Sequence, residues 1–214
     1  MPLNIDQKYA DLEAINVQFN ADLQRHIDGT LPINHIYQLG YPEAILLSAG
    51  VEYLPIELSA KRLAYKASVD YRRCHPFDLS EINDLPKVIN NPIVVFNSTK
   101  NDGATIILTE RKNSRGNHFV TAMKVRGDSS GRKKNTPVNS IASLYPKDDI
   151  LSLIIWINSG DRLIRWINKE KALKFVSAQS TNLIAGGNSI QGINPKLIDS
   201  AINKINGFKN PSYP

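Results

Sequence analysis

Hydrophobic positions in the first half of the chain recur at intervals of three or four residues. From Asn4 to Ile27 this spacing runs among acidic and amide side chains, which predicts one or two amphipathic helices that end near Asp28-Gly29. Similar patterns with Pro, Ser and Gly punctuation predict further helices at Ala44 to Gly50, Ser59 to Arg72 and Leu79 to Ile89. The segment from Val51 to Leu58, which separates the first two of these, is predicted to be a short strand or an extended link.

The hydrophobic period changes after Pro92 from helical to extended. Runs that are rich in β-branched and aromatic residues are typical of strands. Such runs lie at Ile93 to Asn97, Thr105 to Glu110, His118 to Val125, Leu151 to Asn158 and Leu163 to Ile167. They predict a twisted antiparallel sheet of four or five strands. Helical spacing returns from Pro195 to Ile205, where we expect a last helix to dock.

Helices followed by strands are the pattern of an α+β domain. We therefore predict N-terminal helices packed on the antiparallel sheet, with one main core for a chain of 214 residues. The predicted divisions are an acidic helical extension over residues 1–30, the α+β domain over 31–176 and a C-terminal tail over 177–214.

Charge is distributed unevenly along the chain, although the net formal charge is only +6. Met1 to Thr30 holds two Lys or Arg against five Asp or Glu, a net charge of −3. Thr99 to Lys147 holds ten Lys or Arg against three Asp or Glu, a net charge of +7. A cluster of this size attracts polyanions such as RNA or DNA. The alternative is a solvated basic surface that serves solubility.

Several classes of protein do not fit the sequence. Every apolar run is too short to span a bilayer, and the N-terminus lacks the order of a signal peptide, so we expect a cytoplasmic protein or one delivered into a target cell without a classical signal. The single cysteine, Cys74, excludes an internal disulfide. The four histidines do not have metal-binding spacing, so we expect neither a metal nor another cofactor.

A series of short motifs between Ile33 and Phe175 occurs in a familiar order. The motifs are Tyr37-Gln-Leu-Gly-Tyr-Pro-Glu-Ala-Ile-Leu, Arg73-Cys-His-Pro, Asn91-Pro-Ile-Val-Val-Phe-Asn-Ser, Ile107-Leu-Thr-Glu and Asn139-Ser-Ile-Ala-Ser-Leu-Tyr-Pro-Lys, with Trp-Ile and Asn-Lys downstream. Together they resemble the phage-associated nuclease-like domains of the barnase/EndoU/colicin/RelE class.

The resemblance implies a metal-independent ribonuclease of toxin, phage or mobile-element type, with helices on one face of the sheet and the active site on the other. Such cleavage needs a base, an acid and groups that stabilise charge on phosphorus. His75 in the His-Pro step is the candidate acid or base, and its alternative role is to end a helix. The remaining catalytic candidates are Thr109, Ser143, Tyr145 and Lys147, although Ser143 and Tyr145 also suit an ordinary turn or helix. His118 is a weaker acid or base candidate.

Basic residues of the same region are candidates for binding phosphate groups without taking part in the chemistry. Thr109 and Arg111 are expected to share one strand face, with Glu110 on the other. The predicted nucleic-acid-binding residues are Arg111, Lys112, Arg115, Arg132, Lys133 and Lys134.

Two other functions remain open at this point. One is a nucleic-acid-binding or phage-structural module that has lost catalysis, and the other is an interaction effector that an immunity or inhibitor protein recognises, with the acidic first 30 residues covering the basic face. The enzyme requires His75, Thr109 and the Ser143 to Lys147 segment to converge on one site.

Overall fold

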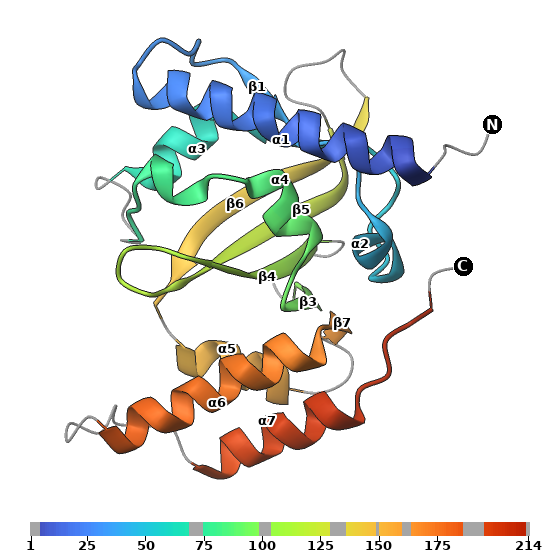
Figure 1. Cartoon of the computed structure of the whole chain (residues 1–214), viewed down its shortest axis with the longest axis vertical. Coiled ribbons are helices and arrows are strands. Elements are labelled where there is room, and N and C mark those ends of the chain that lie inside the picture. The colour runs from blue at the N-terminus through green and yellow to red at the C-terminus, as the bar shows by residue number, and fades with distance from the viewer. Residues whose placement is uncertain are drawn as a thin grey trace.

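A seven-stranded mixed sheet with helices on both faces is the framework of this protein, seen here in a computed structural model (Figure 1). The structure describes residues 5–68, 75–98, 104–128, 136–148, 150–159, 164–185 and 195–212. The α+β class is confirmed. The predicted sheet of four or five antiparallel strands is wrong. The strands Ile36–Gln38 and Pro137–Lys147 were not recognised, the segment from Val51 to Leu58 was predicted only as a short strand or an extended link, and the run from Leu151 to Asn158 forms a helix.

The sheet follows an order that differs from the order of the strands in the chain. Across the sheet the strands are β1 (Ile36–Gln38), β2 (Ile56–Ser59), β6 (Pro137–Lys147), β5 (His118–Asp128), β4 (Ala104–Lys112), β3 (Val94–Asn97) and β7 (Ile164–Ile167). Only the β2–β6 pair is parallel among the described strands, and the other neighbours are antiparallel. The long hairpin of β4 and β5 therefore continues into β6 and forms the centre of the sheet.

The first face of the sheet is covered by N-terminal elements. These are α1 (Ile5–Ile27), α3 (Ala60–Ala67), the 3-10 helix η1 (Leu79–Ile82) and α4 (Leu85–Asn90), with α2 (Ala44–Ser48) between β1 and β2. Their buried side chains include Phe19, Leu23, Leu46, Leu63 and Ile89, which form one cluster with Val95, Ile107, Phe119, Met123, Ile141 and Leu144 of the sheet. Helix α1 is thus part of the main core, since it supplies Phe19 and Leu23.

The second face is covered in part by C-terminal helices, which lie below the sheet in Figure 1. They are α5 (Ile150–Asn158), α6 (Lys169–Ala185) and α7 (Pro195–Gly207). A second cluster joins them to the sheet and includes Val94, Phe96, Leu108, Val120, Leu153, Phe175 and Ile198. The last helix predicted from Pro195 to Ile205 is confirmed as α7. None of the described helices is long and apolar enough to cross a membrane.

Two helix ends follow the predicted capping residues, whereas the predicted end of α3 at Arg72 is wrong, because this helix ends at Ala67. Helix α1 ends at Ile27, and Gly29 has a φ of +71°, a conformation that glycine adopts without steric cost. The Ser59 hydroxyl caps α3 by accepting a hydrogen bond from the Arg62 N–H at 3.4 Å. The helix predicted from Leu79 to Ile89 is divided into η1 and α4, because Asp84 between them has a φ of +61°.

The strand predicted from Leu151 to Asn158 is instead helix α5, so that prediction was wrong. Its sequence is a continuous apolar run, in which periodicity cannot distinguish a buried strand from a buried helix. Leu153, Ile154 and Ile157 are fully buried, whereas Ile155 is 45% exposed. This distribution is the one-sided burial of a helix that packs on a sheet.

The backbone turn at Asp84 fixes α1 to the first face of the sheet. One carboxylate oxygen of Asp84 accepts hydrogen bonds from the side-chain amides of Asn16 at 2.6 Å and Asn20 at 2.8 Å. The side-chain oxygen of Asn20 (Oδ1) in turn accepts a hydrogen bond from the backbone N–H of Asp84 at 2.9 Å. These bonds, the Asn16 bond first, lower the pKa of Asp84. The contact therefore stabilises the charged form of Asp84 and the folded position of α1 together.

We predict that Asn16→Ala lowers the free energy of unfolding by about 2 kcal/mol, because it removes a hydrogen bond to a charged group from a buried position. The folded-state pKa of Asp84 is depressed, so its contribution exists above the unfolded pKa and is lost as pH falls. The difference between wild type and variant in urea unfolding should consequently shrink below about pH 4.

The matched control is Gln24→Ala, which removes an exposed amide of the same helix that binds Asp28. This variant should stay within about 0.5 kcal/mol of wild type. Equal losses in both variants, or a difference for Asn16→Ala that does not change with pH, would contradict the role assigned to Asp84.

Candidate functional site

The second face of the sheet is only partly covered by helices. Among the described residues, the second apolar cluster contains side chains of β3, β4, β5 and β7 but none of β1, β2 or β6. The outward positions of β6 on this face are therefore available for polar side chains. The resemblance implied an open sheet face, and this part of the sheet is where that expectation can apply.

Pairing with β5 shows which residues of β6 lie on this partly open face. Ser143, Tyr145 and Lys147 oppose Ala122, Val120 and His118 of β5 in register. Val120 belongs to the second cluster, and directly opposed residues share a face. Leu144 between them points into the first cluster. Three of the predicted catalytic residues thus lie in a row along one strand, and all three are half-buried.

His75 joins this row from a segment about 70 positions earlier in the chain. Its ring stacks on Tyr145, with the ring centroids 5.3 Å apart and the planes at 30°. Its Nδ1 lies 2.6 Å from Oδ1 of Asp148, which directly follows β6 and Lys147. The side chains of His75 and Asp148 are 26% and 51% exposed, so both are accessible to a ligand.

The segment after His75 is held by packing and by a helix cap. Phe77 packs its edge against Phe119 of β5 at a centroid distance of 5.2 Å. Asp78 then forms a capping box with Glu81 that starts η1. The Phe77 contact and the Asp78 cap therefore hold the chain directly after His75, which places His75 beside β6. Cys74 lies outside the described residues.

A row of basic residues crosses the same end of the sheet. Lys112 of β4 opposes His118 of β5, which opposes Lys147 of β6. Two strand spacings of about 4.8 Å place the backbones of the two lysines roughly 10 Å apart. Lys112 is exposed, as is Arg115 in the turn between β4 and β5, on the left of Figure 1. These cations and His75 gather at one end of the molecule.

Thr109 does not take part in this arrangement. Its side chain is fully buried, and its hydroxyl donates a hydrogen bond to the Phe119 carbonyl at 2.9 Å. The structure therefore brings together His75, Ser143, Tyr145 and Lys147 but not Thr109.

His118 also has a structural environment. Its Nδ1 donates to the Thr109 carbonyl at 2.8 Å, and its ring packs against Phe175 of α6. Burial lowers the pKa of His118, which keeps the ring neutral near pH 7. It fits a core histidine that links β4, β5 and α6 better than an exchangeable acid.

Arg111 lies apart from the row of β6, against η1 and α4. Its Nε donates to the Glu81 carbonyl at 2.6 Å, and the Glu81 carboxylate accepts the Ser114 N–H at 2.6 Å. Arg111 thus fastens the β4–β5 turn to η1. The other predicted nucleic-acid-binding residues, Arg132, Lys133 and Lys134, lie outside the described residues.

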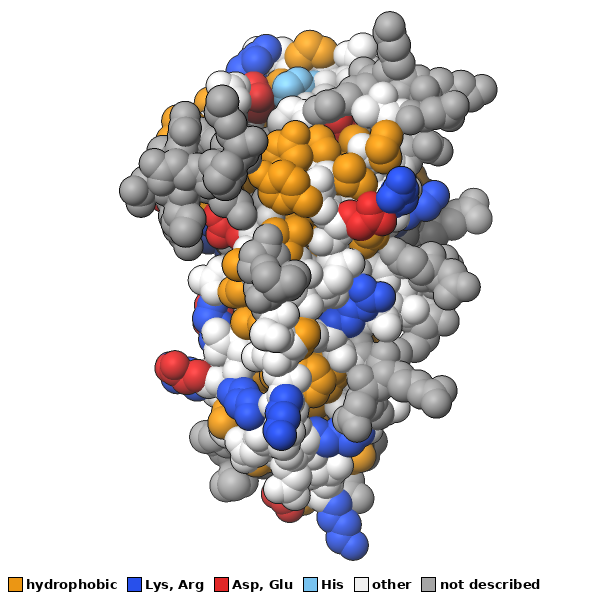
Figure 2. Space-filling view, turned by 90° about the vertical axis from the view of Figure 1, so that its right-hand side faces the viewer, with side chains coloured by type: hydrophobic (Ala, Val, Ile, Leu, Met, Phe, Trp, Pro, Cys, Tyr) orange, Lys and Arg blue, Asp and Glu red, His pale blue; other side chains and the backbone are white. Residues whose placement is uncertain are grey.

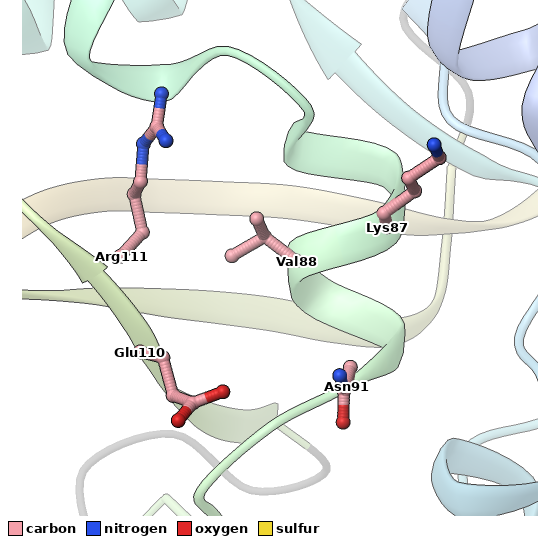
Figure 3. Close-up of a pocket in the computed structure, with 5 residues that line it drawn as sticks. All are labelled: Lys87, Val88, Asn91, Glu110 and Arg111. Atoms are coloured by element: carbon pink, nitrogen blue, oxygen red, sulfur yellow. The ribbon is translucent and has the colours of Figure 1, made fainter.

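A pocket of about 290 Å³ adjoins Arg111 (Figure 3). Its lining residues are Lys87, Val88, Asn91, Glu110 and Arg111. On one side Lys87 pairs with Glu13 at 2.7 Å, and on another Lys171 of α6 pairs with Glu110 at 2.6 Å. Asp148, Asn91 and Lys171 were not identified from the sequence, because no local motif shows that they meet their partners.

The opposite end of the molecule has a different surface. Figure 2 shows hydrophobic side chains gathered in the upper half of that face, while Lys and Arg are more frequent in the lower half. Tyr41 and Tyr53, each 47% exposed, stack on each other with centroids 4.9 Å apart.

The fold defines a class of α+β domain in which a mixed sheet lies between two helical layers. Residues 66–174 match the family model of the phage MuF C-terminal domain, and since they make up just over half of the chain, the protein belongs to this family. The matched region contains β3 to β7, His75 and Asp148. Searches of curated proteins and of solved structures found no match. The family confirms the association with phages that the resemblance implied.

The buried position of Thr109 gives a prediction about stability. Thr109→Val keeps the side-chain shape but leaves the Phe119 carbonyl without this donor, so the free energy of unfolding should fall by about 1 kcal/mol. Denaturant unfolding at pH 7 measures the change. Thr121→Val is the comparison, because the Thr121 hydroxyl of β5 is equally buried but has no hydrogen-bond partner among the described residues. An equal or larger loss there would contradict the role of the Thr109 hydroxyl.

Proposed function

We propose that this protein is a metal-independent endoribonuclease of phage, mobile-element or toxin type. The observation that supports this proposal most is the meeting of His75, Tyr145 and Asp148 at an accessible end of the sheet. An imidazole, a carboxylate and an aromatic platform are parts that cleavage of RNA by its own 2′-hydroxyl can use. Membership of a phage family agrees with the proposed setting.

His75 is the proposed general base. The Asp148 carboxylate beside Nδ1 favours the tautomer that carries its proton there, which leaves Nε2 as the basic nitrogen. Nε2 takes the proton of the 2′-hydroxyl, and the 2′-oxygen forms a bond to phosphorus. The bond from phosphorus to the 5′-oxygen then breaks, which yields a 2′,3′-cyclic phosphate.

The remaining residues of β6 complete the proposed reaction. Lys147 gives a proton to the leaving 5′-oxygen and offsets the negative charge on the phosphate. Ser143, two positions from Tyr145 on the same strand face, donates a hydrogen bond to a phosphate oxygen. Tyr145 carries a base next to the cleaved bond, on the part of its ring that His75 leaves uncovered.

A nucleic-acid-binding module without catalysis is the second candidate, and the positions of Thr109 and His118 favour it. Both residues are buried and bonded within the sheet, which leaves His75 as the one accessible histidine at this end of the described structure. The basic row of Lys112 and Lys147 serves binding whether or not a reaction follows.

The test of the enzyme is incubation of the purified protein with labelled RNA in EDTA. Wild type should release fragments with cyclic-phosphate ends, and His75→Ala should lower the cleavage rate by about 10²-fold to 10⁴-fold, the usual effect of removing an acid–base group. Asp148→Asn should retain more activity than His75→Ala, because it removes only the group that orients the ring.

The matched control for His75 is His35→Ala. His35 has the same side-chain exposure of 26% and also contacts a carboxylate, Asp22, at 3.4 Å. It should cleave RNA at the wild-type rate. RNA that stays intact with wild type but is bound in a salt-dependent way would reject the nuclease and support the binding module.

We also predict that Lys112→Gln weakens RNA binding and makes it less sensitive to salt, because it removes a phosphate contact. Each phosphate contact that is lost should reduce the slope of log affinity against log salt by about 0.7 for single-stranded RNA. Filter binding is measured with proteins that also carry His75→Ala, so that binding is separated from cleavage. The salt concentration is varied from about 50 to about 300 mM, a range that includes physiological ionic strength. Lys174→Gln, on exposed α6 where Lys174 pairs with Glu170, should leave the slope unchanged.

A further inference from the structure

The pocket between α4 and β4 offers hydrogen-bonding groups that the proposed cleavage step does not use (Figure 3). Val88 points across the pocket toward Arg111, so its floor is apolar. The carboxylate of Glu110 points from β4 toward Asn91, which follows α4. The pocket is thus an apolar floor with an acid and an amide on its rim.

Lys171 of α6 orders both rim groups from one side. Its Nζ lies 2.6 Å from Glu110 Oε2 and 2.8 Å from Asn91 Oδ1, and its side chain is only 18% exposed. The carboxylate and the amide are therefore neighbours with fixed orientation. Glu110 Oε1 and Asn91 Nδ2 have no hydrogen-bond partner among the described residues, so one acceptor and one donor remain for a ligand.

Arg111 adds further donors on the other side of Val88, where its guanidinium points away from Glu110 and Asn91 (Figure 3). Its Nε is held by the Glu81 carbonyl, which fixes the plane of the guanidinium. Its two terminal nitrogens have no hydrogen-bond partner in the described part of the chain. The pocket therefore combines several donors with a single strong acceptor.

We infer that this pocket binds a nucleobase that carries a ring N–H beside a carbonyl group, as in guanine and uracil. The carboxylate of Glu110 accepts the ring N–H, and its neighbour Asn91 donates to the adjacent carbonyl oxygen. The flat base lies on Val88 and the aliphatic part of Arg111. Adenine and cytosine have no such ring N–H in a nucleoside, so they lose the strongest contact with the carboxylate.

A bare phosphate is a poorer ligand for the same groups. It has acceptors but no N–H for Glu110, and its charge has the same sign as that carboxylate. The apolar floor also gives it no partner. The combination of Val88, Glu110 and Asn91 therefore favours a base over a phosphate.

The position of the pocket connects it with the proposed nuclease, on which its biological meaning rests. Strand β3 pairs with β4 only over Thr105 to Leu108, so Glu110 lies beyond that pairing, at the end of the sheet that carries Lys112. Strand β6, with Tyr145, is two strands away, roughly 10 Å. A base held in the pocket belongs to a nucleotide close to the cleaved bond.

The experiment is an NMR titration of the full chain with guanosine, uridine, adenosine and cytidine. Guanosine and uridine should cause saturable shifts of the Glu110 and Asn91 amide signals, with affinities about tenfold above those of adenosine and cytidine. Millimolar inorganic phosphate should not displace them. Equal binding of all four nucleosides, no saturable binding, or displacement by phosphate overturns the inference.

Variants test the residues themselves. Glu110→Gln and, independently, Asn91→Ala should each weaken guanosine binding about tenfold. The control is Glu170→Gln, the same substitution in an exposed ion pair with Lys174 on α6, which should bind guanosine like wild type. Thermal melting of each variant verifies folding. Unchanged affinity in both folded pocket variants rejects the assigned contacts.

Nucleosides have no phosphate to cleave, so this result is independent of the proposed reaction. Selective binding by a protein that leaves RNA intact would reject the nuclease and keep the base pocket. RNA cleavage without selective binding would keep the nuclease and reject the pocket.

Discussion

The pairing of β6 with β5 is the constraint on which the candidate site depends. It extends from His118 opposite Lys147 to Asp128 opposite Pro137, with two shifts of register. At one shift, Ala122 opposes Ser143 while the next residue, Met123, opposes Ile141, so Ala142 is an extra residue in β6. An insertion of one residue exchanges the two faces of a strand. Without it, Tyr145 would enter the first apolar cluster.

Because of the bulge, β6 both contributes to the first apolar cluster and presents the candidate site residues on its other face. Ile141 and Leu144 both contribute to the first cluster although they are three positions apart, which a regular strand does not allow. Ser143, Tyr145 and Lys147 consequently lie on the opposite face, where the second cluster contains no side chain of β6 among the described residues. His75 then approaches Tyr145 because Phe77 is anchored on Phe119 of the neighbouring strand.

Much of the helical layer was predictable from the sequence, whereas β6 was not. The bulge is one reason for this difference. Helices α1 and α3 have local caps and one apolar face, which residue spacing reveals. Strand β6 has a broken alternation and polar residues such as buried Asn139, whose Nδ2 donates to the Glu52 and Leu54 carbonyls 85 or more positions away. No local pattern contains that partner. Likewise α5 could be assigned only from what its apolar residues contact.

The site residues also differ in whether a local sequence motif could identify them or whether their role depends on a partner far away in the chain. The motifs around His75 and Tyr145 were visible as a resemblance, and these two residues do meet. Asp148 and Lys171 act through partners that are far away in sequence, so residue type and spacing did not identify them. Thr109 was chosen for its hydroxyl and its strand position, but whether a strand position is buried depends on both neighbouring layers.

The net charge near the candidate site depends on which basic residues form ion pairs in the folded protein. Glu13 pairs with Lys87 and Glu110 pairs with Lys171, so part of the basic excess is offset by carboxylates. Asp22 of α1 is similarly engaged by Arg25 and lies near His35. Lys112 and Arg115 form no ion pair within the described part of the chain, and both are exposed next to the β4–β5 turn. Their positive charges therefore lie at the end of the sheet that also holds His75, and within the described part of the chain no ion pair offsets their attraction for an anion.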